Sequence, residues 1–203
     1  MERINRRSFT EMFANRLTKE MIKTDVIGEE KKEYMIYALE LLFENVISSL
    51  IILVLGGIAG CLIETGLFLI CFLALRKYSG GFHCEREISC YFLTILSYVG
   101  ILITYTFINK NESWIIITIL VAISFIMILA IGTVNHPNLR LDEDELCASR
   151  NRARLIAILI CLSLIIAEKV GIHCRFLLFP GFSIILCAIS LMLAKITKQE
   201  VKS

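Results

Sequence analysis

The stretch Arg76-Lys-Tyr-Ser-Gly-Gly-Phe-His83-Cys-Glu-Arg-Glu-Ile-Ser-Cys90 is a polar break between two long apolar runs. Further apolar runs long enough to cross a bilayer recur along the chain, and the charged residues are segregated from them. The chain is 57% hydrophobic with a mean hydropathy of +0.73, whereas a soluble domain is nearer half apolar. The runs do not alternate apolar and polar residues as a transmembrane barrel would. We therefore predict an all-α polytopic membrane protein.

The apolar runs predict about six transmembrane helices. Residues 34–75 are long enough for two spans that turn near Gly56, Gly57 and Gly60. One span over 41–63 followed by a short re-entrant piece is the alternative for this region. The other four spans are expected at 91–108, 114–134, 155–171 and 176–194, with a kink at Pro180 in the last.

Residues 1–33 are polar throughout and lack the apolar core of a cleavable signal peptide. The capping-box pattern Ser8-Phe-Thr-Glu11 predicts a helix start at Ser8, and Gly28 is expected to end that helix. The apolar residues of this helix recur on one face, and they are Phe9, Met12, Phe13, Leu17 and Met21. This pattern predicts an amphipathic helix in the membrane interface, with packing on a partner or on the protein's own cytoplasmic side as the alternative.

The chain is accordingly divided into a cytoplasmic interfacial segment, 1–33, and one transmembrane domain, 34–203. Basic residues orient this domain, because 18 of the 21 Lys and Arg fall in four segments that six spans place on one side. These segments are 1–33, 76–90, 135–154 and 195–203. Cytoplasmic loops carry such an excess. We expect a multi-pass protein of the cell membrane with both termini in the cytoplasm, and with the 76–90 stretch and the 135–154 loop on the same cytoplasmic face.

His83 and Cys90 suggest a thiol nucleophile with its general base, because a cysteine attacks only as the thiolate. Seven residues of straight helix separate two side chains by about 10.5 Å along the axis. A hydrogen bond between them needs about 2.6–3.2 Å, so a catalytic pair requires a break in the helix, for which Gly80 and Gly81 provide a hinge. From spacing alone, an interfacial histidine and a core cysteine explain the pattern equally well.

The motif from Arg76 to His83, followed by Cys90, resembles the signature of the accessory gene regulator B family. Those bacterial membrane endopeptidases process the propeptide of a cyclic autoinducing peptide used in quorum sensing and virulence regulation. The loop Asn135-His-Pro-Asn-Leu-Arg-Leu-Asp-Glu-Asp-Glu145 is similar to the family's Pro-Asn loop followed by an acidic run. The chain length, the basic amphipathic start and the span count extend the resemblance over nearly the whole chain.

The resemblance implies His83 as the catalytic base and Cys90 as the nucleophile. Cys84 stands where family members usually have a small residue, which places a rival thiol beside the site. The family's chemistry implies cleavage through an acyl-enzyme thioester, which a thiol of the substrate then attacks to close a thiolactone. The implied partners are that propeptide and the lipid bilayer, with no nucleic acid; whether the chain forms homodimers is left open.

Other residues of the site are candidates for supporting roles, and no third catalytic residue is evident. Gly80 and Gly81 offer backbone amides for an oxyanion or act only as a hinge. Substrate-binding candidates are the charged residues Arg76, Lys77, Arg86, Glu40 and Glu44. The basic ones serve equally well to set topology and contact headgroups. The two carboxylates share a helix face, where they could also orient His83 or take part in structural pairing.

Three other interpretations compete with a cysteine endopeptidase. Transport of a small ion or peptide would use the intramembrane carboxylates Glu40, Glu44 and Glu64, although no internal repeat of the transporter kind is present. A membrane scaffold without catalysis is a second alternative. A zinc site would combine His83, Cys84 and Cys90 with His136 or Cys147. That spacing fits no compact ligand motif, so neither a metal nor another cofactor is expected.

Overall fold

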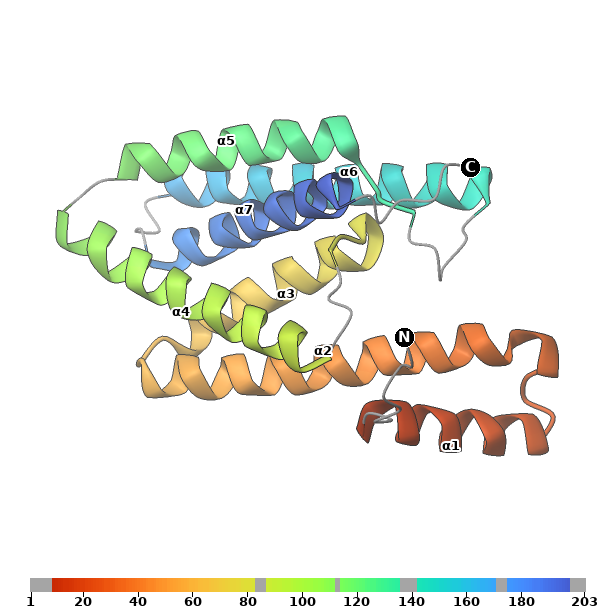
Figure 1. Cartoon of the computed structure of the whole chain (residues 1–203). Coiled ribbons are helices and arrows are strands. Elements are labelled where there is room, and N and C mark those ends of the chain that lie inside the picture. Colours follow the sequence, from red (N-terminus) through yellow and green to blue (C-terminus); the bar gives the residue numbers. More distant parts are fainter. Residues whose placement is uncertain (1–8, 83–86, 112–113, 136–141, 171–174, 198–203) are drawn as a thin grey trace.

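The structure is a computed structural model that describes residues 9–82, 87–111, 114–135, 142–170 and 175–197. The helices are α1 (Phe9–Lys23), α2 (Lys32–Ile58), α3 (Leu62–Ser79), α4 (Glu87–Asn111), α5 (Trp114–Ile131), α6 (Glu143–Lys169) and α7 (Arg175–Ile196), with one 3-10 turn, η1 (Glu29–Lys31) (Figure 1). Over these described ranges the chain forms no β-strand. The prediction of an all-α protein is confirmed.

Helix α7 lies at the centre of the bundle, where it packs against α3, α5 and α6 (Figure 1). Its side chains Phe179, Ile184 and Leu191 are fully buried. In its most apolar stretch of 18 residues 61% is buried, against 11% for the corresponding stretch of α2 and 17% for that of α4. Helix α7 is therefore the core of the bundle, while α2 and α4 turn most of their apolar surface outwards.

Three helices are long and apolar enough to cross a membrane among the residues that the structure describes. They cover Glu29–Ile58, Ser89–Phe107 and Leu177–Ile196, and a shorter apolar helix covers Ile115–Ile131. Large apolar side chains such as Ile58, Phe92 and Ile115 are 80%, 68% and 75% exposed. Exposed apolar surface on this scale is unfavourable in water and suits lipid. The fold is that of an integral membrane protein.

Helices α2 and α3 form the hairpin expected from residues 34–75, with the turn at Ala59–Cys61. The first helix of this hairpin ends at Ile58 and does not run on to residue 63, as the alternative span over 41–63 would require. The hairpin closes where Gly56 meets Thr65, because a Cβ at Gly56 would lie 2.1 Å from the Thr65 hydroxyl oxygen. That hydroxyl donates to the Cys61 carbonyl at 2.5 Å and is hydrogen-bonded to the Tyr98 hydroxyl at 2.5 Å. The glycine thus permits the close approach on which the α2–α3–α4 contact rests.

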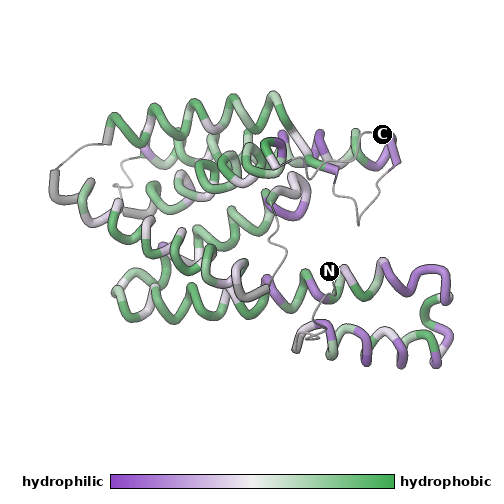
Figure 2. Tube along the Cα trace, viewed as in Figure 1, coloured by the Kyte–Doolittle hydropathy of each residue, from purple (hydrophilic) through white to green (hydrophobic). Residues whose placement is uncertain are grey.

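The carboxyl ends of α3 and α5 meet at one end of the bundle. The amide of Val134 donates to the Ser79 carbonyl at 3.0 Å, and the Thr133 hydroxyl donates to the Tyr78 carbonyl at 2.9 Å. Polar residues gather toward this same end of the bundle (Figure 2). The beginning of the 76–90 stretch, around Tyr78 and Ser79, therefore lies beside the residues that lead into the 135–154 segment.

Two helix boundaries differ from the sequence prediction. Helix α6 begins at Glu143, inside the segment 135–154 that was expected to be a loop. A capping box explains the early start, since the Glu145 carboxylate accepts from the Asp142 amide at 3.4 Å. Helix α1 ends at Lys23 and not at Gly28, because Asp25 takes a left-handed backbone with φ of 53°.

Helix α1 packs along the amino-terminal half of α2 (Figure 1). Its buried residues are the small ones, Thr10, Ala14 and Thr18, which recur every fourth position. Helix α2 is 27 residues long, or about 40 Å, which exceeds the roughly 30 Å hydrocarbon core of a bilayer. Met12 and Leu17 of α1 remain 54% and 45% exposed. The interfacial location of α1 stays a prediction that this exposed apolar face permits.

Gly56→Ala should destabilise the protein, because the new methyl would overlap the Thr65 side chain. Overpacking of this kind costs about 1–3 kcal/mol, or a fall of about 2–12 °C in the apparent Tm of the purified protein. Gly57→Ala is the matched control, since its Cβ would meet only Leu62 at 3.9 Å. The control should leave the Tm unchanged or slightly raised; equal losses in both variants would contradict the close approach at Gly56.

Candidate functional site

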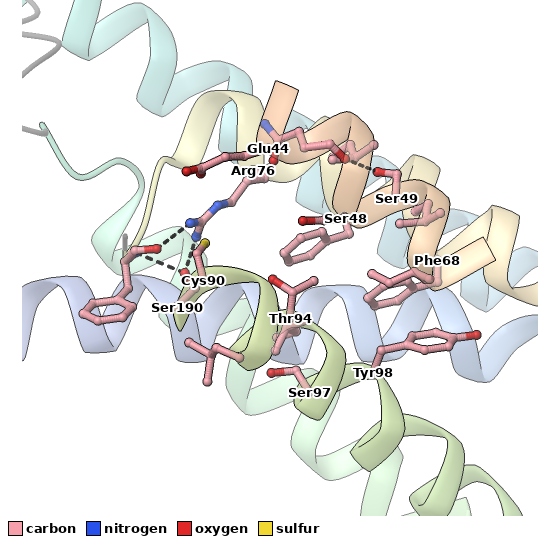
Figure 3. A pocket seen from close by; sticks show the side chains of 18 of the residues that line it. Glu44, Ser48, Ser49, Phe68, Arg76, Cys90, Thr94, Ser97, Tyr98 and Ser190 are labelled. Atoms are coloured by element: carbon pink, nitrogen blue, oxygen red, sulfur yellow. Dashed lines mark hydrogen bonds between the residues drawn. The ribbon is translucent and has the colours of Figure 1, made fainter. Parts of the chain in front are cut away.

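A cavity of about 180 Å³ lies between α2, α3, α4 and α7 (Figure 3). Its walls are mainly apolar. The polar groups that reach it include Glu44, Ser48, Arg76, Cys90, Thr94 and Ser190. A largely apolar cleft with a few convergent polar groups is the usual form of a binding or active site.

Cys90 lies in the first turn of α4 and is half-buried. Thr94 and Ser97 follow it at helical spacing on the side of α4 that lines the cavity. The Cys90 sulfur points toward the Arg76 guanidinium and the Ser190 hydroxyl (Figure 3). Because side chains lean toward the amino terminus of their helix, the thiol is directed to the positive end of the α4 dipole.

Arg76, near the end of α3, holds the chain that leads to His83. Its guanidinium donates to the Phe82 carbonyl at 2.5 Å and to the Ser190 hydroxyl of α7. The Phe82 amide donates back to Ser190, at 3.1 Å to both its hydroxyl and its carbonyl oxygen. We refer to Arg76, Phe82 and Ser190 as the loop clamp. Arg76, predicted as a substrate-binding candidate, thus has a structural role in fixing the loop.

Gly80 and Gly81 take backbone angles that other residues rarely adopt, with φ of 66° and 129°. A side chain at Gly81 would overlap its neighbours, and one at Gly80 would be in tight contact with the backbone. A Cβ at Gly81 would lie 2.3 Å from Arg76 Nη1 and 2.6 Å from Ser190 Oγ, and one at Gly80 would lie 3.0 Å from the Val134 carbonyl oxygen. The amide of Gly80 donates to the Arg76 carbonyl at 3.1 Å as the cap of α3. The geometry suits a hinge; an oxyanion role remains a prediction.

The predicted carboxylates separate into two places. Glu44 lines the cavity, and the Tyr37 phenol lies within electrostatic range of Glu44, Arg76 and Glu40. Glu64 is buried in the first turn of α3, twelve residues before Arg76 and hence about 18 Å away along the helix. The three carboxylates proposed for a transport path do not form one cluster.

Lys77 points away from the cavity that Arg76 lines. It is exposed, and its ammonium lies 5.4 Å from the centre of the neighbouring Tyr78 ring, which the Arg152 guanidinium of α6 also approaches at 5.6 Å. A cation over an aromatic face is favourable. Lys77 therefore belongs to the polar end of the bundle, next to α6.

His83, Cys84, Arg86 and His136 lie outside the described residues. The convergence of His83 and Cys90 thus stays a prediction, as does the place of the rival thiol. Within the described ranges, no three His, Cys, Asp or Glu side chains are grouped so that they could hold a metal ion.

The small hydroxyl residues of the cavity were missed by sequence reasoning. Ser190 lies inside an apolar run and only the fold shows that it joins the loop clamp. A signal was nevertheless present on α4, where Cys90, Thr94 and Ser97 share one face of an otherwise apolar helix. Ser48 on α2, one turn after Glu44, repeats that pattern.

Fold and site together define an all-α integral membrane protein with a cysteine facing a cavity among its helices. The family model of accessory gene regulator B matches residues 10–197, and the chain belongs to this family. Membership implies a part in accessory gene regulator quorum-sensing processing.

An AgrB-like protein of Clostridium perfringens (strain 13 / Type A) is similar to part of the chain. The two are 36% identical over 83 residues, which are 40% of this chain and 39% of that relative. No solved structure matches the chain.

Gly81→Ala should loosen the loop clamp, because the methyl would overlap Arg76 and Ser190 and the backbone angle would be strained. Local opening then becomes more frequent. We expect tryptic cleavage between α3 and α4 to rise about tenfold, which corresponds to roughly 1.4 kcal/mol. Gly100→Ala is the control, since no atom lies within 4 Å of its Cβ position; equal cleavage rates in both variants would show that the clamp does not restrain the loop.

Proposed function

We propose that the chain is a membrane cysteine endopeptidase in which Cys90 is the nucleophile and His83 the general base. Its substrate is the propeptide of a cyclic autoinducing peptide, cut on the carboxyl side of the segment that becomes the ring. One observation carries this proposal. Cys90 lines the same cavity as Phe82, the residue directly before His83 in the chain.

Two features of the site support Cys90 as a thiolate. The Arg76 guanidinium brings a positive charge to the cavity that Cys90 also lines, and the Cys90 sulfur points toward it (Figure 3). The amino-terminal end of α4 contributes a partial positive charge. Both stabilise a thiolate, which is the reactive form of cysteine. His83 takes the thiol proton, and the loop clamp keeps the start of its loop at the cavity.

The reaction follows from these positions. The Cys90 thiolate attacks a carbonyl of the propeptide; a sulfur–carbon bond forms, the carbon–nitrogen bond breaks, and His83 passes its proton to the departing amine. The acyl group is then held as a thioester. A substrate thiol, deprotonated by His83, attacks that carbonyl, so that the thiolactone forms and the Cys90 thiolate is regenerated.

Cyclisation wins over hydrolysis where water is scarce. The exchange of one thioester for another is nearly balanced in energy, whereas water would end the reaction at a linear acid. The cavity has apolar walls from four helices of a membrane bundle. A site that excludes water in this way protects a reactive intermediate from side reactions.

The bundle end that carries the site is proposed to face the cytoplasm, with both termini on that side of a multi-pass protein. The excess of basic residues in the 1–33, 76–90, 135–154 and 195–203 segments supports this orientation. Arg86 and Lys77 remain candidates for binding acidic parts of the propeptide, and Glu40 and Glu44 for its basic parts or for orienting His83.

Cys90→Ala should lower the rate at which reconstituted protein cleaves the cognate propeptide about a thousandfold or more, because the variant lacks the proposed nucleophilic sulfur. Cys84→Ala should keep most of the activity, since a side chain adjacent to His83 is poorly placed to use it. The measurement is release of the carboxyl-terminal fragment, followed by mass spectrometry. Cys147→Ala is the control, an exposed thiol of α6. Loss of cleavage in Cys84→Ala but not in Cys90→Ala would reverse the assignment of the nucleophile.

Cys147 should be labelled by a membrane-impermeant maleimide in inside-out vesicles but not in intact cells. It is exposed on α6, in the segment whose basic residues predict a cytoplasmic location. Comparing the same thiol in the two preparations controls for its reactivity. Rapid labelling in intact cells would refute the proposed orientation.

A further inference from the structure

The cavity does not end at Cys90 but continues along α4. The lining residues of α4 run from Cys90 through Thr94 and Ser97 to Tyr98. Eight residues of helix correspond to about 12 Å. The thiol therefore stands at one end of an elongated recess, and we call the part beyond it the deep recess.

The deep recess ends in rigid aromatic side chains. Phe68 stacks on Phe72 with ring centres 5.5 Å apart, and it contacts Tyr98 at 5.9 Å between centres. The Tyr98 hydroxyl is fixed by its 2.5 Å hydrogen bond to Thr65, so its polar atom is turned to a partner and its ring to the recess. Tyr98 and Phe68 are each only 1% exposed. The end wall is thus preformed and apolar.

The size of the cavity suits one large side chain. Its volume is about 180 Å³, and an apolar protein cavity of about 150 Å³ is known to hold a benzene molecule. The residues facing it from α2 and α4 include the small Ser48, Thr94 and Ser97, which leave space there. Glu44 and Arg76 lie toward the Cys90 end of the cavity (Figure 3). A charged side chain in the deep recess would be desolvated among aromatic walls, which is costly.

We propose that the deep recess binds the side chain of the acyl residue, the residue whose carbonyl Cys90 attacks, and that it selects a large apolar one. This inference rests on the proposed function. The acyl residue is the one to hold, because it stays bonded to Cys90 until the ring closes while the other fragment must leave. Thr94 and Ser97 determine the specificity, since their small side chains leave the space that the acyl residue fills.

A set of N-acetyl-aminoacyl chloromethyl ketones tests this without knowledge of the propeptide. In these probes the side chain of the acyl residue is Phe, Leu, Ala, Gly or Asp. The Cys90 thiolate displaces chloride; one sulfur–carbon bond forms, one carbon–chlorine bond breaks, and chloride leaves with the electron pair. The rate of Cys90 modification is measured by mass spectrometry on the full chain in nanodiscs.

With the wild-type chain, the Phe and Leu probes should modify Cys90 at least about tenfold faster than the Ala and Gly probes, and the Asp probe should be slowest. Thr94→Leu and Ser97→Leu fill the recess. Each should lower the ratio of the Phe rate to the Ala rate about tenfold, and a ratio within one variant does not depend on how much protein is folded. Thr104→Leu is the matched control, an exposed threonine of α4 outside the cavity, and should keep the wild-type ratio.

The outcomes separate the two proposals. If no probe modifies Cys90, the proposed nucleophile fails and the subsite with it. If all probes modify Cys90 at similar rates, the deep recess does not bind the acyl side chain, although the nucleophile stands. If Thr94→Leu and Ser97→Leu slow every probe equally, a lipid chain or another occupant fills the recess, and the proposal is overturned.

Discussion

The site depends on the hydrogen bonds that the Arg76 guanidinium makes to the Phe82 carbonyl and the Ser190 hydroxyl. A charge among apolar helices is unfavourable unless polar groups surround it. Here the charge is satisfied by the Phe82 carbonyl and the Ser190 hydroxyl, in the cavity that Cys90 also lines. One side chain thereby connects α3, the start of the His83 loop and the central helix α7. The hydrogen bond that satisfies this charge holds Phe82 in place. Gly81 leaves room for the guanidinium, because a Cβ there would overlap it.

The helices of the bundle differ in how much of their apolar surface is buried. Helix α7 is the most buried of the three described helices that are long and apolar enough to cross a membrane, and it forms the centre of the bundle, while α2 and α4 turn most of their apolar surface outwards. The cavity lies between these two kinds of helix. Unfilled space in a protein core is destabilising, so small residues such as Ser48, Thr94 and Ser97 along one seam keep a cavity that apolar residues would close. The cavity lies beside Cys90, which faces it from the first turn of α4.

Helix boundaries show where sequence patterns were sufficient. The turn between α2 and α3 was predicted from three glycines and is found there. The early start of α6 was not predicted, because the polar run between two apolar runs was interpreted as a loop. Asp142 and Glu145 form a capping box that marks this start. Lys77 and Arg76 are adjacent and were given one role, but helix geometry turns one outwards and the other into the cavity.

The sequence by itself determined the class of protein, the helices and the candidate thiol. Hydrophobicity, glycine positions and charge segregation are local properties, and they act on each segment separately. Only the tertiary structure decided that Ser190, over a hundred residues from Arg76, completes the loop clamp, and that Glu44 and Glu64 lie apart. Only packing decided that α4 faces a recess ending at Phe68 and Tyr98. The physical reason is that these contacts join faces of different helices, and the rotation of one helix against another is set by side-chain packing over the whole bundle.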